Sequence, residues 1–261
     1  MESVTSADGT AIAYSRGGGG PALILVHGTG VDHHVWDDVV PTLSESFEVY
    51  AIDRRGRGES GDTEEYSIEH EFDDIAALAA SIDGPVNVVA HSYGAICAVG
   101  AAQRVSELRR LVLYEPPLWR GDGSPSPPPE QRRMRELVDR GDYQGVLETY
   151  WVDMRGEPDR FQRLKSRSDY DRRVDVAHTF PREMSGRREF RPTPETYPAV
   201  EVPTLLLTGS ETHDSIKRSV AATAALFPDG ETVEIDGCGH AAMNTAPERF
   251  VSEVVDFLVD G

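Results

Sequence analysis

The chain has few cysteines, few lysines and no long apolar run, and each shortage argues against particular classes of protein or partner. No apolar run approaches the roughly 18 residues that a membrane span needs, so we expect no membrane partner. The N-terminus has neither a basic start nor an apolar stretch, so no signal peptide is expected. Cys97 and Cys238, the only cysteines, lack metal-ligand spacing. Reduced thiols in a cytoplasmic protein are therefore predicted.

Nearly all the basic residues are arginines, and acidic residues outnumber basic ones. Lys165 and Lys217 are the only lysines, against 24 arginines, and the formal net charge is -19. Such a charge argues against nucleic acid or an anionic membrane as partner. Adaptation to a salt-rich cytoplasm is the favoured explanation of this composition, and a high-GC genome alone is the other.

Apolar strands alternate with helical stretches along most of the chain. The strand candidates end in VHG, YAID, VAHS, YEPP, LTGS and GCGH, and an amphipathic stretch, ERFVSEVVDFLVD, closes the chain. Continuous apolar strands alternating with helices indicate an α/β fold, with a parallel sheet covered by helices on both faces.

Residues 118–200 break this alternation. Proline-rich stretches, GDGSPSPPP and RPTPETYP, mark the two ends, and three helical stretches (130–140, 142–154 and 159–168) lie between them. We predict a helical cap inserted into a core of residues 1–117 and 201–261. The cap holds 15 arginines and Lys165 against 15 acids. Either these charges form ion pairs within the cap, or some arginines face an acidic or carbonyl-rich substrate.

Ser92 lies where an apolar strand meets a small-residue helix, in VVAHSYGAIC. A serine on a tight strand-to-helix turn needs small residues two positions away on either side, and Ala90 and Gly94 meet that need. This is the pattern of a nucleophile elbow, with alanine in place of the first glycine. The structural alternative is a serine that caps the helix.

Two glycine-containing loops could complete a site around Ser92. The loop HGTG follows an apolar strand, and its Thr29 N–H together with the Tyr93 N–H would form an oxyanion hole. His240 ends the glycine-rich loop IDGCGH after the last strand, from which an imidazole can reach a distant serine.

Together these motifs identify the chain as resembling the α/β-hydrolase family over nearly its whole length. HGTG, IDRRGRGES, AHSYG, LYEPP and GCGHAAMNTAPERF occur in the family's order. The resemblance implies a mostly parallel eight-stranded sheet, a cap inserted after the sixth strand, and chemistry without a cofactor. In this family IDRRGRGES is mainly a turn after the fourth strand, so we assign it no catalytic role.

The acid of the expected triad is where the sequence departs from most relatives. Most relatives carry it about three residues past a glycine that corresponds to Gly209, where this chain has Thr212. A second family arrangement places the acid at the end of the sixth strand, where Glu115 stands. Glu115 is the favoured acid, and Asp214 and Glu211 remain alternatives.

Aromatic and histidine side chains near these motifs are candidates for the pocket. We predict that His33, Trp36 and Trp151 line the substrate site. The run Asp32-His33-His34 invites a metal, but adjacent histidines point in different directions and no third ligand is suitably spaced, so no metal is predicted.

The sequence therefore predicts a serine hydrolase that cleaves a small carboxylic ester, lactone or thioester. Ser92 would attack the carbonyl, His240 would transfer the proton and Glu115 would orient His240. The alternatives are carbon–carbon bond hydrolysis or cofactor-free perhydrolysis with the same triad, and a non-catalytic receptor for a small ligand. Substrate identity and oligomeric state are not predicted.

Overall fold

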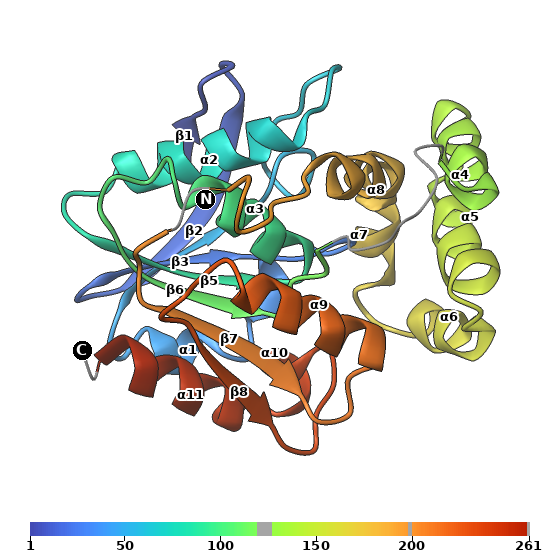
Figure 1. Ribbon diagram of the computed structural model, residues 1–261. Coiled ribbons are helices and arrows are strands. Elements are labelled where there is room, and N and C mark those ends of the chain that lie inside the picture. Colours follow the sequence, from blue (N-terminus) through green and yellow to red (C-terminus); the bar gives the residue numbers. More distant parts are fainter. Residues whose placement is uncertain (119–126, 198–199, 260–261) are drawn as a thin grey trace.

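One mostly parallel sheet of eight strands runs through the protein, as the sequence predicts (Figure 1). The computed structural model describes residues 1–118, 127–197 and 200–259. The spatial order is β1-β2-β4-β3-β5-β6-β7-β8, in which the β1–β2 and β2–β4 pairs are antiparallel and the others parallel. The strands are β1 (Glu2–Thr5), β2 (Ala11–Gly18), β3 (Ala22–Val26), β4 (Glu48–Ile52), β5 (Val86–His91), β6 (Leu108–Tyr114), β7 (Thr204–Gly209) and β8 (Glu231–Ile235).

Helices cover both faces of the sheet because alternate side chains of the apolar strands point to opposite faces. Along β3, Ile24 belongs to a core layer with α2 and α3, whereas Leu23 and Leu25 belong to a second layer with α1 and α11. Figure 1 shows α2 and α3 above the sheet and α1 and α11 below it. The helices of this part are α1 (Val40–Leu43), α2 (Ile68–Ala80), α3 (Tyr93–Ala101), α9 (Asp214–Ala224), α10 (Ala242–Thr245) and α11 (Pro247–Val259).

The described residues between β6 and β7 form helices and no strand. Their apolar side chains, among them Met134, Val146 and Phe161, make a buried cluster of their own. We call α4 to α8 the helical insertion. It comprises α4 (Pro129–Asp139), α5 (Tyr143–Glu148), a π-helical turn (Thr149–Met154), α6 (Pro158–Lys165), α7 (Tyr170–Asp175), a 3-10 turn (Ala177–Thr179) and α8 (Phe180–Glu189).

The sequence predicts three of these helical stretches but neither α7 nor α8. Residues 121–126 of the first proline-rich stretch and residue 198 of the second lie outside the described residues. The division into a core of residues 1–117 and 201–261 and a cap of residues 118–200 stays a prediction.

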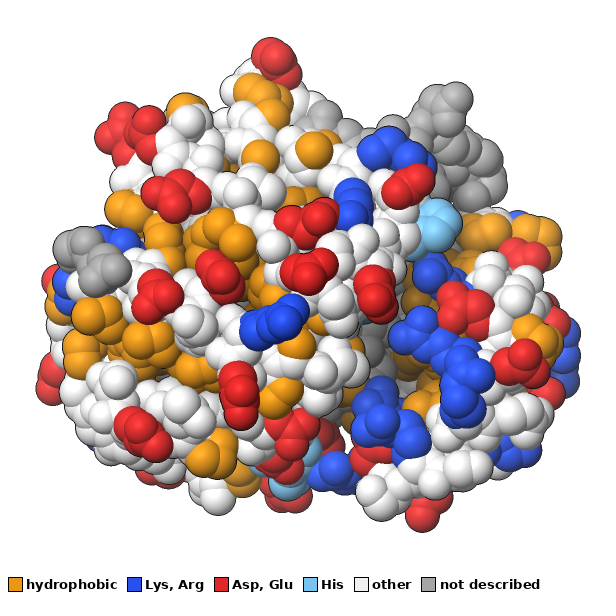
Figure 2. Space-filling model, turned by 90° about the horizontal axis from the view of Figure 1, so that it is seen from below, with side chains coloured by type: hydrophobic (Ala, Val, Ile, Leu, Met, Phe, Trp, Pro, Cys, Tyr) orange, Lys and Arg blue, Asp and Glu red, His pale blue; other side chains and the backbone are white. Residues whose placement is uncertain are grey.

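Charge is unevenly spread over the surface. Figure 2 shows acidic side chains scattered over the left and centre of the view from below. Basic side chains gather on the right, on the side where Figure 1 places the helical insertion. The contrast follows the sequence, in which most arginines lie between residues 118 and 200.

The carboxyl ends of the parallel strands meet at one edge of the sheet. Ser92 follows β5, Glu115 follows β6, Thr212 lies beyond the end of β7 and His240 lies beyond β8. Loops at this edge are where α/β proteins place ligands and reacting groups. In the described part of the chain, no helix is both long and apolar enough to cross a membrane.

Candidate active site

Ser92 stands in a strained turn between β5 and α3. Its φ of 52° and ψ of -121° lie outside the regions that residues with a side chain normally adopt. A Cβ on Gly94 would lie 2.3 Å from the His27 carbonyl oxygen and 2.6 Å from that of Val26, so this position requires glycine. The Ser92 side chain makes no capping hydrogen bond to α3. The alternative of a structural capping serine is therefore wrong.

Ser92, His240 and Glu115 form a chain of hydrogen bonds. The Ser92 Oγ lies 3.0 Å from His240 Nε2, and His240 Nδ1 lies 2.5 Å from Glu115 Oε2. The Glu115 side chain is fully buried, whereas that of His240 is 37% exposed. With Nδ1–H donating to the carboxylate, Nε2 is left to accept the Ser92 proton, so the three groups have the geometry of a catalytic triad.

His91 forms a hydrogen bond with the loop that carries His240. The His91 Nε2 lies 2.8 Å from the His240 carbonyl oxygen, to which it donates. Burial, with a further contribution from His240, lowers the pKa of His91 to about 3, so His91 is neutral near pH 7. A neutral ring in this position fixes the His240 backbone without adding a second cation beside the triad.

Glu115 is stabilised as a carboxylate by several donors from β7 and the loop after it. Its Oε1 accepts hydrogen bonds from the Gly209 N–H (2.8 Å), the Thr208 hydroxyl (3.2 Å) and the Thr212 hydroxyl. Burial acts against the charged form, but the hydrogen bonds from His240, Thr212 and Gly209 outweigh it and lower the pKa of Glu115. The charge needed to orient His240 is therefore present near neutral pH.

Thr212 is a residue that sequence reasoning missed. It stands where the resemblance places the acid of most relatives, and its hydroxyl donates to the carboxylate of Glu115, the acid that the sequence predicts instead. Its position three residues past Gly209 can be read from the sequence, but a hydroxyl there has a recognisable role only because Glu115 lies opposite. The hydrogen-bond partner of His240 Nδ1 is Glu115 and neither of the other two acids, which are both exposed, Asp214 at the start of α9 and Glu211 in the loop before it.

The two backbone segments predicted to form the oxyanion hole flank Ser92. Tyr93 is the first residue of α3, where N–H groups have no partner within the helix. Gly28, which precedes Thr29, is close to the nucleophile, since a Cβ on it would lie 3.0 Å from the Ser92 Cβ. The loop that carries Thr29 is thus beside Ser92. The roles of the two N–H groups stay predictions.

The predicted pocket residues have different fates. Trp36 is fully buried in the core layer formed with α1 and α11, with its ring centre 6.2 Å from that of Phe250. The prediction that Trp36 lines the substrate site is therefore wrong, because its ring fills the core. His33 is anchored with Nδ1 2.7 Å from Asp53 Oδ1. Trp151 packs in the helical insertion with the Arg160 guanidinium 4.2 Å from its ring centre.

Substrate contacts of His33 and Trp151 stay predictions. Burial opposes protonation of His33, but the hydrogen bond and charge of Asp53 raise its pKa. No group of three or more His, Cys, Asp or Glu side chains in the described part of the chain is arranged to hold a metal ion.

Comparison with known proteins finds relatives along almost the full chain. A model of the alpha/beta hydrolase family matches residues 23–253. The chain is 31% identical, over 263 aligned positions, to N-formylmaleamate deformylase from Pseudomonas putida, with 97% of this chain and 94% of that protein covered.

Solved structures agree. An alpha/beta hydrolase from Sphaerobacter thermophilus has a TM-score of 0.86 at 28% identity, covering 99% of this chain and 100% of that one. The enol-lactonase from Burkholderia xenovorans has a TM-score of 0.78 at 20% identity, covering 98% and 99%, a likeness that concerns the fold alone.

Proposed function

Because the chain belongs to the alpha/beta hydrolase family, we propose that it is a serine hydrolase that forms an acyl-enzyme on Ser92. Its proposed substrate is a small carboxylic ester, lactone or thioester. The observation that carries the proposal is the hydrogen-bonded chain from the Ser92 Oγ through His240 to the buried Glu115 carboxylate. A serine held in a strained turn beside a correctly oriented imidazole has the features of an activated nucleophile.

The proposed reaction proceeds in two stages. The Ser92 Oγ attacks the carbonyl carbon while His240 Nε2 takes the hydroxyl proton, and the N–H groups of Thr29 and Tyr93 stabilise the oxyanion. His240 then gives the proton to the leaving group, and an ester of Ser92 remains. Water activated by His240 attacks this ester and releases the acid. Throughout, Glu115 holds the imidazole in one tautomer and stabilises its cation.

A second candidate is the hydrolysis of a formamide. The observation that favours it is the similarity to N-formylmaleamate deformylase, which extends over nearly the whole of both chains. The same two stages would act on a formyl carbon: the nitrogen leaving group departs first with the proton that His240 gives it, and water then releases formate from the formyl ester of Ser92. For N-formylmaleamate the leaving group is the amide of maleamate.

The first experiment tests the nucleophile. We expect a fluorophosphonate to add one adduct per chain, visible in the intact mass, in low or in molar salt. The adduct should disappear in Ser92→Ala and persist in Ser81→Ala, a matched control whose hydroxyl caps the end of α2 by donating to the Leu78 carbonyl. A folded protein that forms no adduct at any salt concentration would contradict the proposal and favour the ligand receptor.

A substrate panel then separates the candidates. It would contain short p-nitrophenyl esters, a small lactone, an acyl thioester and N-formylmaleamate, with formate release measured for the last. Ester, lactone or thioester turnover that depends on Ser92 supports the first candidate. A kcat/KM for formate release that is higher than the kcat/KM for the esters would favour the second candidate.

A further inference from the structure

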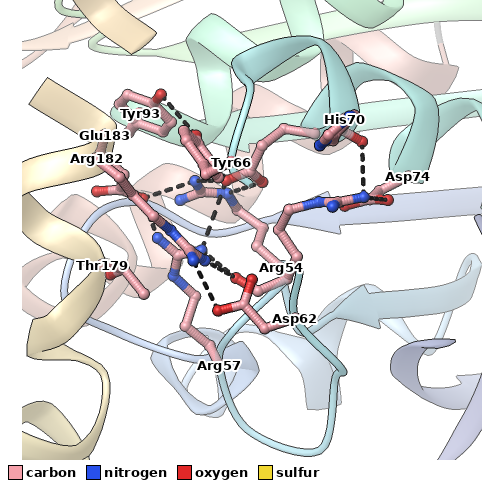
Figure 3. Close-up of polar contacts among 12 residues, drawn as sticks. Arg54, Arg57, Asp62, Tyr66, His70, Asp74, Tyr93, Thr179, Arg182 and Glu183 are labelled. Carbon is pink, nitrogen blue, oxygen red and sulfur yellow. Dashed lines mark hydrogen bonds and ion pairs between the residues drawn. The ribbon is translucent and has the colours of Figure 1, made fainter. Parts of the chain in front are cut away.

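A cluster of buried charges joins the core to the helical insertion (Figure 3). It consists of Arg54 and Arg57, from the loop after β4, Glu71 of α2 and Glu183 of α8, and we call these four residues the buried charge cluster. Each side chain is at most 2% exposed. Sequence reasoning treated this loop as a turn without catalytic significance.

Arg54 is the centre of the buried charge cluster. Its guanidinium binds Glu71 at two points, with Nε 3.0 Å from Oε2 and Nη2 2.6 Å from Oε1. The same Nη2 lies 2.7 Å from Glu183 Oε1, to which Arg57 also donates. Burial acts against the charge of Glu71, but Arg54 and Arg57 outweigh it and lower its pKa to about 2. The position of Arg54 is therefore set jointly by α2 and by the insertion.

Arg54 also contacts the peptide unit that contains the Thr29 N–H. Its Nη1 lies 3.2 Å from the Gly28 carbonyl oxygen, which also accepts from His27 Nδ1 at 2.9 Å. In a trans peptide the carbonyl oxygen and the N–H of the next residue point in opposite directions. Holding the Gly28 oxygen toward Arg54 therefore points the Thr29 N–H away from it. A cation on the carbonyl also polarises that N–H and makes it a stronger donor.

The second predicted donor, Tyr93, is held by the same arginine. The Arg54 guanidinium lies 4.7 Å from the centre of the Tyr93 ring, and the Tyr93 hydroxyl lies 2.9 Å from that of Tyr66. From the insertion, α8 closes this space: a Cβ on Gly186 would lie 2.4 Å from the Tyr93 hydroxyl oxygen. Arg54 thus contacts both segments that carry the proposed oxyanion donors, and α8 lies against the Tyr93 side chain.

We propose that Arg54 is a positioning residue of the oxyanion hole and that Glu183 of the helical insertion sets its position. The hole is then correctly assembled only when α8 sits on the core. This inference rests on the proposed serine hydrolase function. The structural alternative is that the buried charge cluster merely attaches the insertion, in which case its loss would lower stability without a specific effect on the chemical step.

Arg54→Lys tests the inference, with Arg55→Lys as its matched control. Lysine keeps the charge, but its single nitrogen cannot replace the three guanidinium nitrogens that bind Glu71 at two points, Glu183 and the Gly28 carbonyl. Arg55 is an equally buried arginine on the same loop, and it binds Asp74 at two points (2.8 and 2.7 Å) and Asp8 (2.9 Å) instead of the oxyanion segments. Both replacements therefore remove a buried forked ion pair.

We expect Arg54→Lys to lower kcat for a p-nitrophenyl ester, and the rate of fluorophosphonate labelling, by about tenfold to a hundredfold, since loss of one oxyanion donor costs about 10²–10³ in kcat. KM should stay within about threefold, because the oxyanion forms only in the transition state. Arg55→Lys should lower the melting temperature with little change in kcat. Equal kcat losses in the two variants, or an unchanged kcat in Arg54→Lys, would overturn the inference.

A second pair of variants tests the part played by Glu183 and decides the matter if Arg54→Lys does not fold. Glu183→Asp keeps the charge but shortens the reach to Arg54, whereas Asp62→Asn breaks another contact of α8 with the core, the 2.7 Å ion pair of Asp62 with Arg182. We expect Glu183→Asp to lower kcat and the labelling rate several-fold and Asp62→Asn to leave both near wild type. Equal losses would overturn the role of Glu183.

The labelling assay distinguishes failure of the positioning role of Arg54 from failure of the proposed serine hydrolase function. Wild-type protein that labels at Ser92, with Arg54→Lys labelling equally fast, overturns the inference and leaves the proposed function standing. Wild-type protein that does not label overturns the proposed function, and the inference falls with it.

Discussion

Two residues at the carboxyl ends of neighbouring strands have backbone conformations that non-glycine residues rarely adopt. Ser92 after β5 has a φ of 52° and Glu115 after β6 has a φ of 51°, and the described residues contain no other non-glycine φ above zero. Such conformations cost about 1–3 kcal/mol each and tend to occur at functional sites. Here they lie at the two ends of one hydrogen-bonded chain through His240.

Glu115 is the proposed acid of the triad, and its replacement tests that role. Glu115→Gln should lower kcat by about 10³–10⁴, because the neutral amide does not stabilise the imidazolium and its NH2 group can donate to His240 Nδ1, which favours the wrong tautomer. Steady-state kinetics on a p-nitrophenyl ester measures the loss, with Asp214→Asn as the control that should retain activity. If Asp214→Asn loses activity and Glu115→Gln does not, the acid has been assigned to the wrong residue.

Two buried histidines make the folded state sensitive to mild acid. Burial, followed by nearby positive charge, lowers the pKa of His27 and of His91 from 6.5 to about 3. Below pH 6.5 the unfolded chain binds these protons and the folded protein does not. The free energy of unfolding should therefore fall as pH drops from 6.5, by up to about 1.4 kcal/mol per histidine and pH unit.

Urea unfolding between pH 6.5 and about 5 measures this slope above the usual range of carboxylate titration. His91→Gln should reduce the slope, while His213→Gln, at an exposed position, should not. A slope that is the same in all three proteins would show that the buried histidines do not titrate as expected.

At the scale of elements, α8 connects the helical insertion to the nucleophile. It carries Glu183, which binds Arg54, and Gly186, which lies against Tyr93. The sequence did not predict α8, because the segment from 180 to 189 is rich in charged residues and has no clear apolar periodicity. Its buried residues are Phe180, Pro181, Glu183 and Gly186, and two of them make the contacts with the core named above, an ion pair from Glu183 and a close approach of Gly186 to Tyr93.

Gly186→Ala should move α8 away from the elbow. The added Cβ would lie 2.4 Å from the Tyr93 hydroxyl oxygen and 3.0 Å from the Ile68 Cβ, so the helix or the ring must shift. Alanine favours a helix over glycine by about 1 kcal/mol, but overpacking costs about 1–3 kcal/mol. We therefore expect a net loss of stability, with a lower kcat.

Thermal unfolding and ester kinetics check this prediction, with Glu189→Ala, at an exposed site on the same helix, as the control. A stabilised Gly186→Ala protein with wild-type kcat would mean that α8 is not held against Tyr93 in the way the contacts indicate.

At the scale of the whole molecule, negative charge predominates and the sheet part carries it. The formal net charge of -19 creates repulsion that disfavours the compact state at low ionic strength. The predicted adaptation to salt gives an expected outcome. Raising KCl from about 0.1 M to about 2 M shortens the screening length from about 10 Å to under 3 Å and should raise the melting temperature by several degrees.

The matched comparison is sorbitol at the same osmolality, which changes excluded volume but screens no charge. If the melting temperature rises equally in sorbitol, or does not rise in KCl, the prediction of salt adaptation is wrong. A high-GC genome would then be the explanation for the shortage of lysine.

The sequence by itself determined the features that depend on neighbouring residues. Apolar runs predicted the strands of a mostly parallel sheet, and the small residues around Ser92 predicted the elbow, because strand propensity and turn sterics act over a few residues. Only the tertiary structure decided which acid meets His240, that Trp36 belongs to the core, and that Arg54 meets Glu183, 129 positions away along the chain. Such pairings depend on the order of the strands in the sheet and on where α8 packs against the core. No local pattern of residues encodes either of these.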